Sequence, residues 1–156
     1  MFLKKRKNPV GPTDNSTGAF ACNIEVFNEA RVDPALYSPT ALAFLGDAVF
    51  SLLVREGLLK SGNRPAQKLH KMSMLFVSAA AQAKAASVLL PMLSEEEAAV
   101  YKRGRNAHSS HTPKNQTEAD YHSATGLEAL FGYLYLKNEK ERIAELFGII
   151  MGGYYE

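Results

Sequence analysis

Two acidic residues, Asp47 and Glu128, each interrupt a strongly apolar stretch of the chain. An unpaired carboxylate is costly to bury, so each acid needs a partner, a proton or a metal ion. On a helical wheel, Asp47 points almost opposite the apolar face of its segment, among small and aromatic side chains, so we do not expect it on a polar, solvent-facing side. That apolar face comprises Leu42, Leu45, Val49, Leu52 and Leu53.

Small residues flank both acids at helical spacing. Ala43 and Ser51 lie one turn from Asp47, and Ala124 and Gly132 lie one turn from Glu128. Small side chains let a second helix approach closely, so we expect the two acids to share one site. Two neighbouring carboxylates that both stay ionised need a cation between them, and oxygen ligands favour Mg²⁺ or Mn²⁺. Periodicity alone leaves open that either acid is a surface residue paired with a lysine.

The elements that must position these acids are helices. Alanine and leucine are abundant, and Ser94 with Glu97 three residues later forms a capping box. Thr40 is the expected N-cap of the Asp47 helix, and Thr117 begins the Glu128 helix. We therefore predict an all-α bundle of six or seven helices, at about 41–59, 65–76, 77–91, 94–103, 117–136 and 140–151.

Composition restricts the class of protein. The 156 residues are 46% hydrophobic and 22% charged, with a net charge of +2, so any basic surface for nucleic acid must be local. One cysteine, Cys22, excludes an internal disulfide framework. Residues 1–21 are expected to be a flexible basic tail and residues 22–156 a single domain. No signal peptide or membrane span is apparent, and we expect a cytoplasmic protein.

Two motifs resemble those of the ribonuclease III family. Residues 44–49 read Phe-Leu-Gly-Asp-Ala-Val, and residues 128–132 read Glu-Ala-Leu-Phe-Gly, followed by Tyr135 and Leu136. Several further segments are similar to the short Mini-III subgroup, notably 69–71, 77–79, 82–83, 102–107, 112–115 and 123–128. Ordinary members carry two more acids, where this chain has Ala43 and Thr125. The Mini-III subgroup lacks them too, and water is then expected to complete the ion's coordination.

The resemblance implies a homodimeric ribonuclease III catalytic-domain bundle that hydrolyses double-stranded RNA and leaves 5′-phosphate ends. Asp47 and Glu128 would be the catalytic residues and the ligands of Mg²⁺, with Mn²⁺ a plausible substitute. Cutting both strands needs two sites, hence a symmetric dimer. Phe44 is expected to insert into the partner subunit at the dimer interface, although an intrachain core position stays open for it.

Substrate binding is expected from a basic segment between the two motifs. Family members usually carry a double-stranded-RNA-binding domain after the catalytic domain, and we expect none here, where the sequence stops at Glu156. From Ala98 to Thr117 there is no acid, and basic and amide side chains there suit phosphates and 2′-hydroxyls. The expected RNA-binding residues are Lys102, Arg103, Arg105, Asn106, Lys114 and Asn115.

The Mini-III resemblance points to precursor 23S ribosomal RNA as the substrate, with a large-subunit ribosomal protein as a possible partner. The alternative is a noncatalytic RNA- or ribosome-binding module with the same fold, against which the retention of both Asp47 and Glu128 argues. A third interpretation, an unrelated carboxylate–metal bundle, predicts Glu-x-x-His pairs. None appears among the expected helices.

Overall fold

The computed structural model describes residues 33–107 and 116–152, and within these ranges all regular structure is helical. Six α-helices follow one another: α1 (Pro39–Lys60), α2 (Ala66–Val77), α3 (Ala79–Leu89), α4 (Glu95–Arg105), α5 (Glu118–Leu136) and α6 (Lys140–Gly152). Short 3₁₀ turns, η2 (Pro34–Leu36) and η3 (Leu90–Met92), precede α1 and follow α3. The all-α prediction is confirmed for the described residues. The predicted tail boundary at residue 21 lies outside them.

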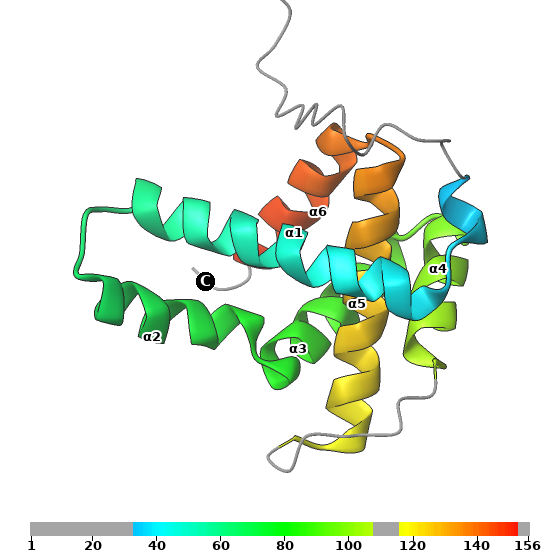
Figure 1. Ribbon diagram of the computed structural model, residues 1–156, viewed down its shortest axis with the longest axis horizontal. Coiled ribbons are helices and arrows are strands. Elements are labelled where there is room, and N and C mark those ends of the chain that lie inside the picture. The colour runs from blue at the N-terminus through cyan, green and yellow to red at the C-terminus, as the bar shows by residue number, and fades with distance from the viewer. Residues whose placement is uncertain (1–32, 108–115, 153–156) are drawn as a thin grey trace, which may run out of the picture. The chain divides into compact units, whose positions relative to one another are not determined.

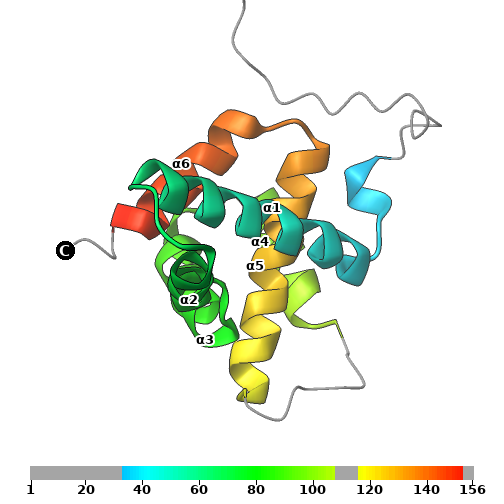
Figure 2. The ribbon, with the colours of Figure 1, turned by 60° about the vertical axis from the view of Figure 1, so that its left-hand side comes forward.

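Helix α5 is the centre of the bundle, and α1, α3, α4 and α6 all pack against it (Figure 1). Helix α1 runs across α5 (Figure 2), and α2 turns back alongside α1 before the chain bends by 48° into α3 (Figure 1). The break falls at Ser78, which caps both α2 and α3, and Ser78 Oγ accepts a hydrogen bond from the Ala81 N–H at 3.4 Å. This break lies two residues beyond the one expected near Phe76.

Helix α1 begins two residues earlier than predicted. Ser38, not Thr40, is the N-cap, and its Oγ accepts a hydrogen bond from the Ala41 N–H at 3.2 Å. Pro39 occupies the first helical position, where its fixed φ and missing N–H are tolerated. The predicted capping box at Ser94 and Glu97 is confirmed, with bonds of 2.8 and 3.2 Å.

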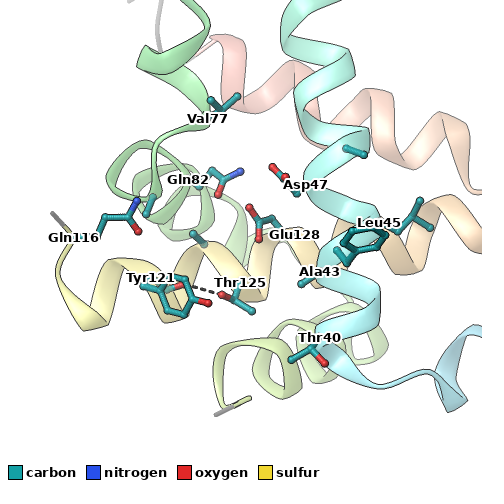
Figure 3. Close-up of a pocket in the computed structure, with 14 residues that line it drawn as sticks. Thr40, Ala43, Leu45, Asp47, Val77, Gln82, Gln116, Tyr121, Thr125 and Glu128 are labelled. Atoms are coloured by element: carbon teal, nitrogen blue, oxygen red, sulfur yellow. Dashed lines mark hydrogen bonds between the residues drawn. The ribbon is translucent and has the colours of Figure 1, made fainter. Parts of the chain in front are cut away.

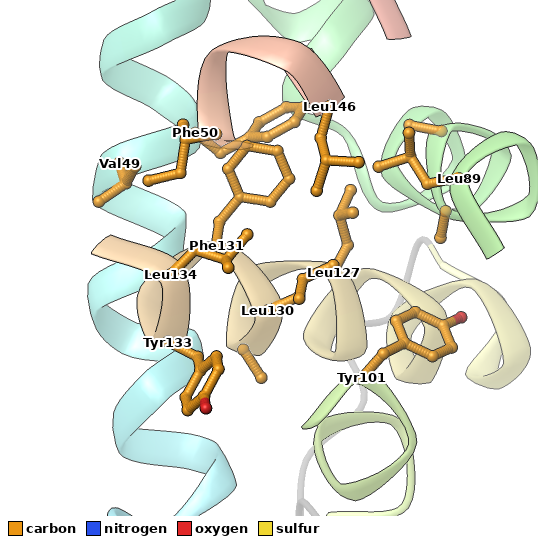
Figure 4. Packing of buried hydrophobic residues seen from close by; sticks show 14 of the residues in the cluster. Val49, Phe50, Leu89, Tyr101, Leu127, Leu130, Phe131, Tyr133, Leu134 and Leu146 are labelled. Carbon is orange, nitrogen blue, oxygen red and sulfur yellow. The ribbon is translucent and has the colours of Figure 1, made fainter. Parts of the chain in front are cut away.

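The hydrophobic core lies where α5 meets α1, α3 and α6 (Figure 4). Phe50 of α1 stacks edge-on against Phe131 of α5 and Phe147 of α6, with ring centroids 5.3 and 5.7 Å apart. Such aromatic pairs add orientation-dependent attraction to the burial of apolar area. Leu52, which the wheel placed on the core face of α1, is instead 54% exposed, so that assignment was wrong.

Charged side chains tie α4 to α5 and α6. The buried Glu97 accepts hydrogen bonds from Arg142, which also donates to the Met92 carbonyl at 2.8 Å. The Arg142 guanidinium and the Ser94 N–H together hold the pKa of Glu97 below its ordinary value.

Within the described residues, no single helix is both long and apolar enough to cross a membrane, although the bent α2–α3 pair passes that test by length and composition alone.

Candidate active site

The crossing of α1 and α5 places Asp47 and Glu128 in the same pocket. Gly46 precedes Asp47, and a Cβ on Gly46 would overlap the Glu128 carbonyl. Reciprocally, a Cβ on Gly132 would overlap the Leu42 carbonyl. The two helices therefore touch backbone to backbone, one turn from Glu128 and beside Asp47. The predicted close approach of a second helix at Gly132 is confirmed.

The pocket has a volume of about 550 Å³ and opens beside both acids (Figure 3). Helix α1 contributes one wall, the first half of α5 contributes another, and the start of α3 closes the inner end. The two carboxylates differ in their surroundings, because Asp47 is exposed and Glu128 is half-buried. The wheel prediction that Asp47 avoids solvent was therefore wrong, although the two acids do face one pocket.

Burial is the main cause of the raised pKa of Glu128. Loss of solvent, and after it the nearby charge of Asp47, raise the pKa of the Glu128 carboxyl from 4.5 to about 7, and the Gln82 amide acts in the opposite direction. A carboxylate that is disfavoured by burial and by a like charge is stabilised when a cation binds beside it. This pair of acids thus has the electrostatic character of a cation site.

The donor set fits a hard divalent cation. Both candidate ligands are carboxylates, the class that Mg²⁺ and Mn²⁺ prefer. In the described ranges no cluster of three or more His, Cys, Asp or Glu side chains could hold a metal. Ala43 and Thr125, one turn before the two acids, add no carboxylate, and the Thr125 hydroxyl donates to the Tyr121 carbonyl at 2.9 Å. An ion held here would take two protein carboxylates, with water filling the remaining positions.

Phe44 lies at the rim of this pocket and is 85% exposed. The alternative interpretation, that Phe44 is plain intrachain core, is therefore wrong. At helical spacing Phe44 aligns with the exposed residues Ala48 and Leu52, so an apolar stripe runs along the outer side of the first half of α1. Contiguous exposed apolar surface is typical of protein–protein interfaces.

The predicted RNA-binding residues that the structure describes gather at the C-terminal end of α4. Lys102, Arg103, Arg105 and Asn106 are all exposed there. Arg103, however, donates hydrogen bonds to the Ala35 and Tyr37 carbonyls at 3.1 and 3.0 Å, which fastens η2 and the start of α1 to α4. Its guanidinium is thus already engaged within the chain. Lys114 and Asn115 lie outside the described residues.

Arg105 and Asn106 line a second hollow together with residues at the start of α5. This groove has a volume of about 450 Å³, and its other walls are Glu118, Ala119 and His122. The Nδ1 atom of His122 is buried and has no hydrogen-bond partner among the described residues. The groove is separate in its lining from the acidic pocket, and it presents a cation, an amide, an imidazole and a carboxylate together.

Sequence reasoning missed several polar residues that line the acidic pocket. Gln82 is 1% exposed and its amide group is turned toward the two carboxylates (Figure 3). The other uncharged polar residues of the lining are Thr40, Gln116, Tyr121 and Thr125. A signal for Gln82 was present, because it is a single amide within an otherwise alanine-rich turn, Ala79–Ala83. Its position facing Glu128 depends on the long-range packing of α3 on α5.

Comparison with known proteins gives consistent matches. The Ribonuclease III domain profile matches residues 40–139. Mini-ribonuclease 3 of Brevibacillus brevis is 49% identical over 128 residues, covering 80% of this chain and 96% of that protein. Mini-ribonuclease 3 of a Thermoanaerobacter species is 46% identical, with coverage of 85% and 92%. A crystal structure of a Fusobacterium nucleatum protein superposes with a TM-score of 0.70 at 33% identity, covering 78% of this chain and 98% of that one.

Proposed function

Because the chain belongs to the ribonuclease III family, we propose that Asp47 and Glu128 hold a divalent metal ion, Mg²⁺ or Mn²⁺, with which the protein cleaves double-stranded RNA. Family membership makes the chain an endoribonuclease, and the family's activity depends on divalent metal. The observation that carries the assignment of residues is the shared pocket of Asp47 and Glu128, formed where Gly46 and Gly132 let α1 and α5 meet.

When bound, the ion neutralises charge on the scissile phosphate and activates water for attack on the phosphodiester. Asp47 and Glu128 act as ligands rather than as general bases, since a carboxylate engaged by a cation is a poor proton acceptor. The exposed side of Asp47 faces the approach of substrate, while the half-buried Glu128 anchors the site from within. The pocket lining also has apolar parts, including Ala43 and Val77.

We further propose a homodimer that brings two such pockets to one RNA duplex. Each pocket cuts one strand, so cleavage of a duplex needs two copies related by symmetry. The exposed stripe of Phe44, Ala48 and Leu52 supplies the apolar surface that a self-complementary interface requires. The interface would adjoin the active site, because Phe44 is common to the stripe and the pocket rim.

RNA contacts beyond the active site are proposed for Lys102, Arg105 and Asn106, with Lys114 and Asn115 of the same basic segment. Cations there neutralise phosphates, and amides reach the 2′-hydroxyls that distinguish RNA from DNA. The substrate proposed on the strength of the Mini-ribonuclease 3 relatives is precursor 23S ribosomal RNA in the cytoplasm, with a large-subunit ribosomal protein helping to present it. Matched precursor transcripts with and without their terminal duplex provide a test of this choice.

The direct test of function is to incubate the purified protein with end-labelled duplex RNA, with and without Mg²⁺, and to size the products. We expect discrete fragments with 5′-phosphate ends only when Mg²⁺ is present. Asp47→Asn should abolish cleavage while changing duplex affinity, measured in chelator, by less than about threefold. Undiminished turnover by Asp47→Asn would rule out the metal-binding role. Duplex binding without cleavage by the parent protein would favour the noncatalytic alternative.

A further inference from the structure

Gln82 is a buried amide with an unsatisfied donor. Its side chain is 1% exposed, and Nε2 has no hydrogen-bond partner among the described residues. Buried polar groups are nearly always paired, so an unpaired one needs an explanation. The amide faces the carboxylates of Asp47 and Glu128 across the inner end of the pocket (Figure 3). The missing partner therefore belongs to this site.

We infer that Gln82 is a positioning residue, whose Nε2 donates to the Glu128 carboxylate and turns its other oxygen toward the bound divalent ion. This inference rests on the proposed function, because it assumes that an ion binds between the two acids. Ligands of metal ions are commonly oriented by a hydrogen bond from a second side chain, which leaves one oxygen free for the ion. A neutral donor suits this position, because a third charged group would change the net charge that Asp47 and Glu128 present to the ion.

Glu128 is the acid that needs such a donor. The structure gives no side-chain hydrogen bond to Glu128 within the described residues, and the nearby Thr125 hydroxyl donates to the Tyr121 carbonyl instead. Asp47 differs, because it is exposed to water and lies 3.5 Å from Ser51 Oγ. The contact between Gln82 and Glu128 also opposes the rise in the Glu128 pKa that burial causes. A donor to the ionised carboxylate has this effect.

The backbone of α3 holds Gln82 firmly in place. Ser78 caps the helix, and the Gln82 N–H donates to the Ser78 carbonyl at 2.9 Å, so Gln82 lies in the first turns of α3. The flanking residues Ala79, Ala85 and Ala86 are buried against the bundle. If this position served packing alone, leucine or methionine would fill the same space and would leave no polar atom unpaired.

The first test measures Mn²⁺ affinity of the RNA-free protein by electron paramagnetic resonance or calorimetry. Gln82→Met keeps a similar side-chain length and removes the donor, and Gln67→Met is the matched control, because Gln67 is an exposed amide on α2 outside the pocket. We expect Gln82→Met to weaken Mn²⁺ binding about 10- to 100-fold and Gln67→Met to leave it unchanged. Duplex affinity in chelator should change less than about twofold in both variants. A folded Gln82→Met protein with parental Mn²⁺ affinity would overturn the inference.

The second test needs no substitution at Gln82, so it decides the matter even if Gln82→Met fails to fold. Mg²⁺ is titrated into ¹⁵N-labelled parent protein, and the side-chain amide resonances of Gln82 and Gln67 are followed. We expect the Gln82 Nε2 protons to shift and to exchange more slowly with water as the ion saturates, with Gln67 unaffected. Saturable Mg²⁺ binding with an unmoved Gln82 amide refutes the role of Gln82. Absence of any Mg²⁺ binding refutes the proposed function instead.

Discussion

Gly46 of α1 lies against the backbone of Glu128 in α5, and the absence of a side chain there lets the helices that carry Asp47 and Glu128 meet closely. The same contact is repeated in reverse by Gly132, whose Cβ would overlap the Leu42 carbonyl. A comparable pair joins α4 to α5, where Gly104 lies against Ala129 and Gly126 lies against the Tyr101 ring. The central helix is thus approached closely by α1 and by α4, and Glu128 lies at the crossing with α1.

Gly46→Ala is expected to destabilise the fold by about 1–3 kcal/mol or more, because the added methyl group meets backbone that has no room to move. Gly57→Ala is the matched control on the same helix. Nothing lies within 4 Å of a Cβ there, so the better helix propensity of alanine should stabilise the protein by up to about 1 kcal/mol. Urea unfolding followed by circular dichroism measures both. Equal effects of the two substitutions would contradict the close crossing.

The raised pKa of Glu128 predicts a pH-dependent stability in chelator. The folded protein keeps the Glu128 proton up to about pH 7, whereas the ordinary value is 4.5, so the free energy of unfolding should fall as pH rises across that window. Glu128→Gln removes the ionised form. We expect this variant to be more stable than the parent by about 2–3 kcal/mol at pH 8 and nearly equal to it at pH 4.

Mg²⁺ should cancel this difference at pH 8, because the ion stabilises the ionised carboxylate in the parent alone. The measurement is chemical unfolding at pH 4 and pH 8, with chelator or with Mg²⁺. A parent protein that is the more stable of the two at pH 8 in chelator would show that burial and Asp47 do not penalise the Glu128 charge.

Arg103 and Arg105 are expected to behave differently although both are exposed basic residues of α4. Arg103→Ala should lower the free energy of unfolding by about 1 kcal/mol, because the Ala35 and Tyr37 carbonyls lose their donors. Arg105→Ala should leave stability unchanged, weaken duplex binding, and reduce the slope of log affinity against log salt by about one. Fluorescence anisotropy over a salt series measures the slope. An unchanged slope for Arg105→Ala would remove it from the RNA interface.

Phe44→Ala is expected to weaken self-association, because it removes the largest exposed side chain of the stripe on α1. Analytical ultracentrifugation should give a dimer for the parent and at least a tenfold larger dissociation constant for the variant. Leu136→Ala is the control, because Leu136 is an exposed apolar residue in the last turn of α5, outside the stripe. Identical dissociation constants for Phe44→Ala and the parent would place the dimer interface elsewhere.

Local features of the fold were predictable from the sequence, and long-range features were predictable only in part. The capping box at Ser94 and Glu97 needs residues three apart, so the pattern suffices to identify it. The cap of α1 was misplaced because Ser38 and Thr40 are both suitable, and Pro39 decides between them by taking the first helical position. Such choices shift a helix end by one or two residues without moving its faces.

The faces of α1 could not be separated by periodicity. Apolar residues surround this helix, so the wheel could not distinguish the core face from the exposed stripe that includes Leu52. Gly46 marks the close crossing with α5, but Gly57 in the same helix has open space around it, so a helical glycine alone does not identify the packed face. The pairing of Asp47 with Glu128 followed from their small neighbours. Gln82 was missed as a site residue because its role depends on how α3 docks against both other helices.

The central claim, that Asp47 and Glu128 hold one common divalent ion, is tested most directly by Mn²⁺ binding in a double-mutant cycle. Affinity is measured for the parent, Asp47→Asn, Glu128→Gln and the double variant, all without RNA. We predict one Mn²⁺ site in the parent, loss of at least about tenfold in affinity in each single variant, and little further loss when the two are combined. Parental affinity in either single variant, or a second Mn²⁺ site that survives at parental affinity when one acid is replaced, would contradict a shared ion.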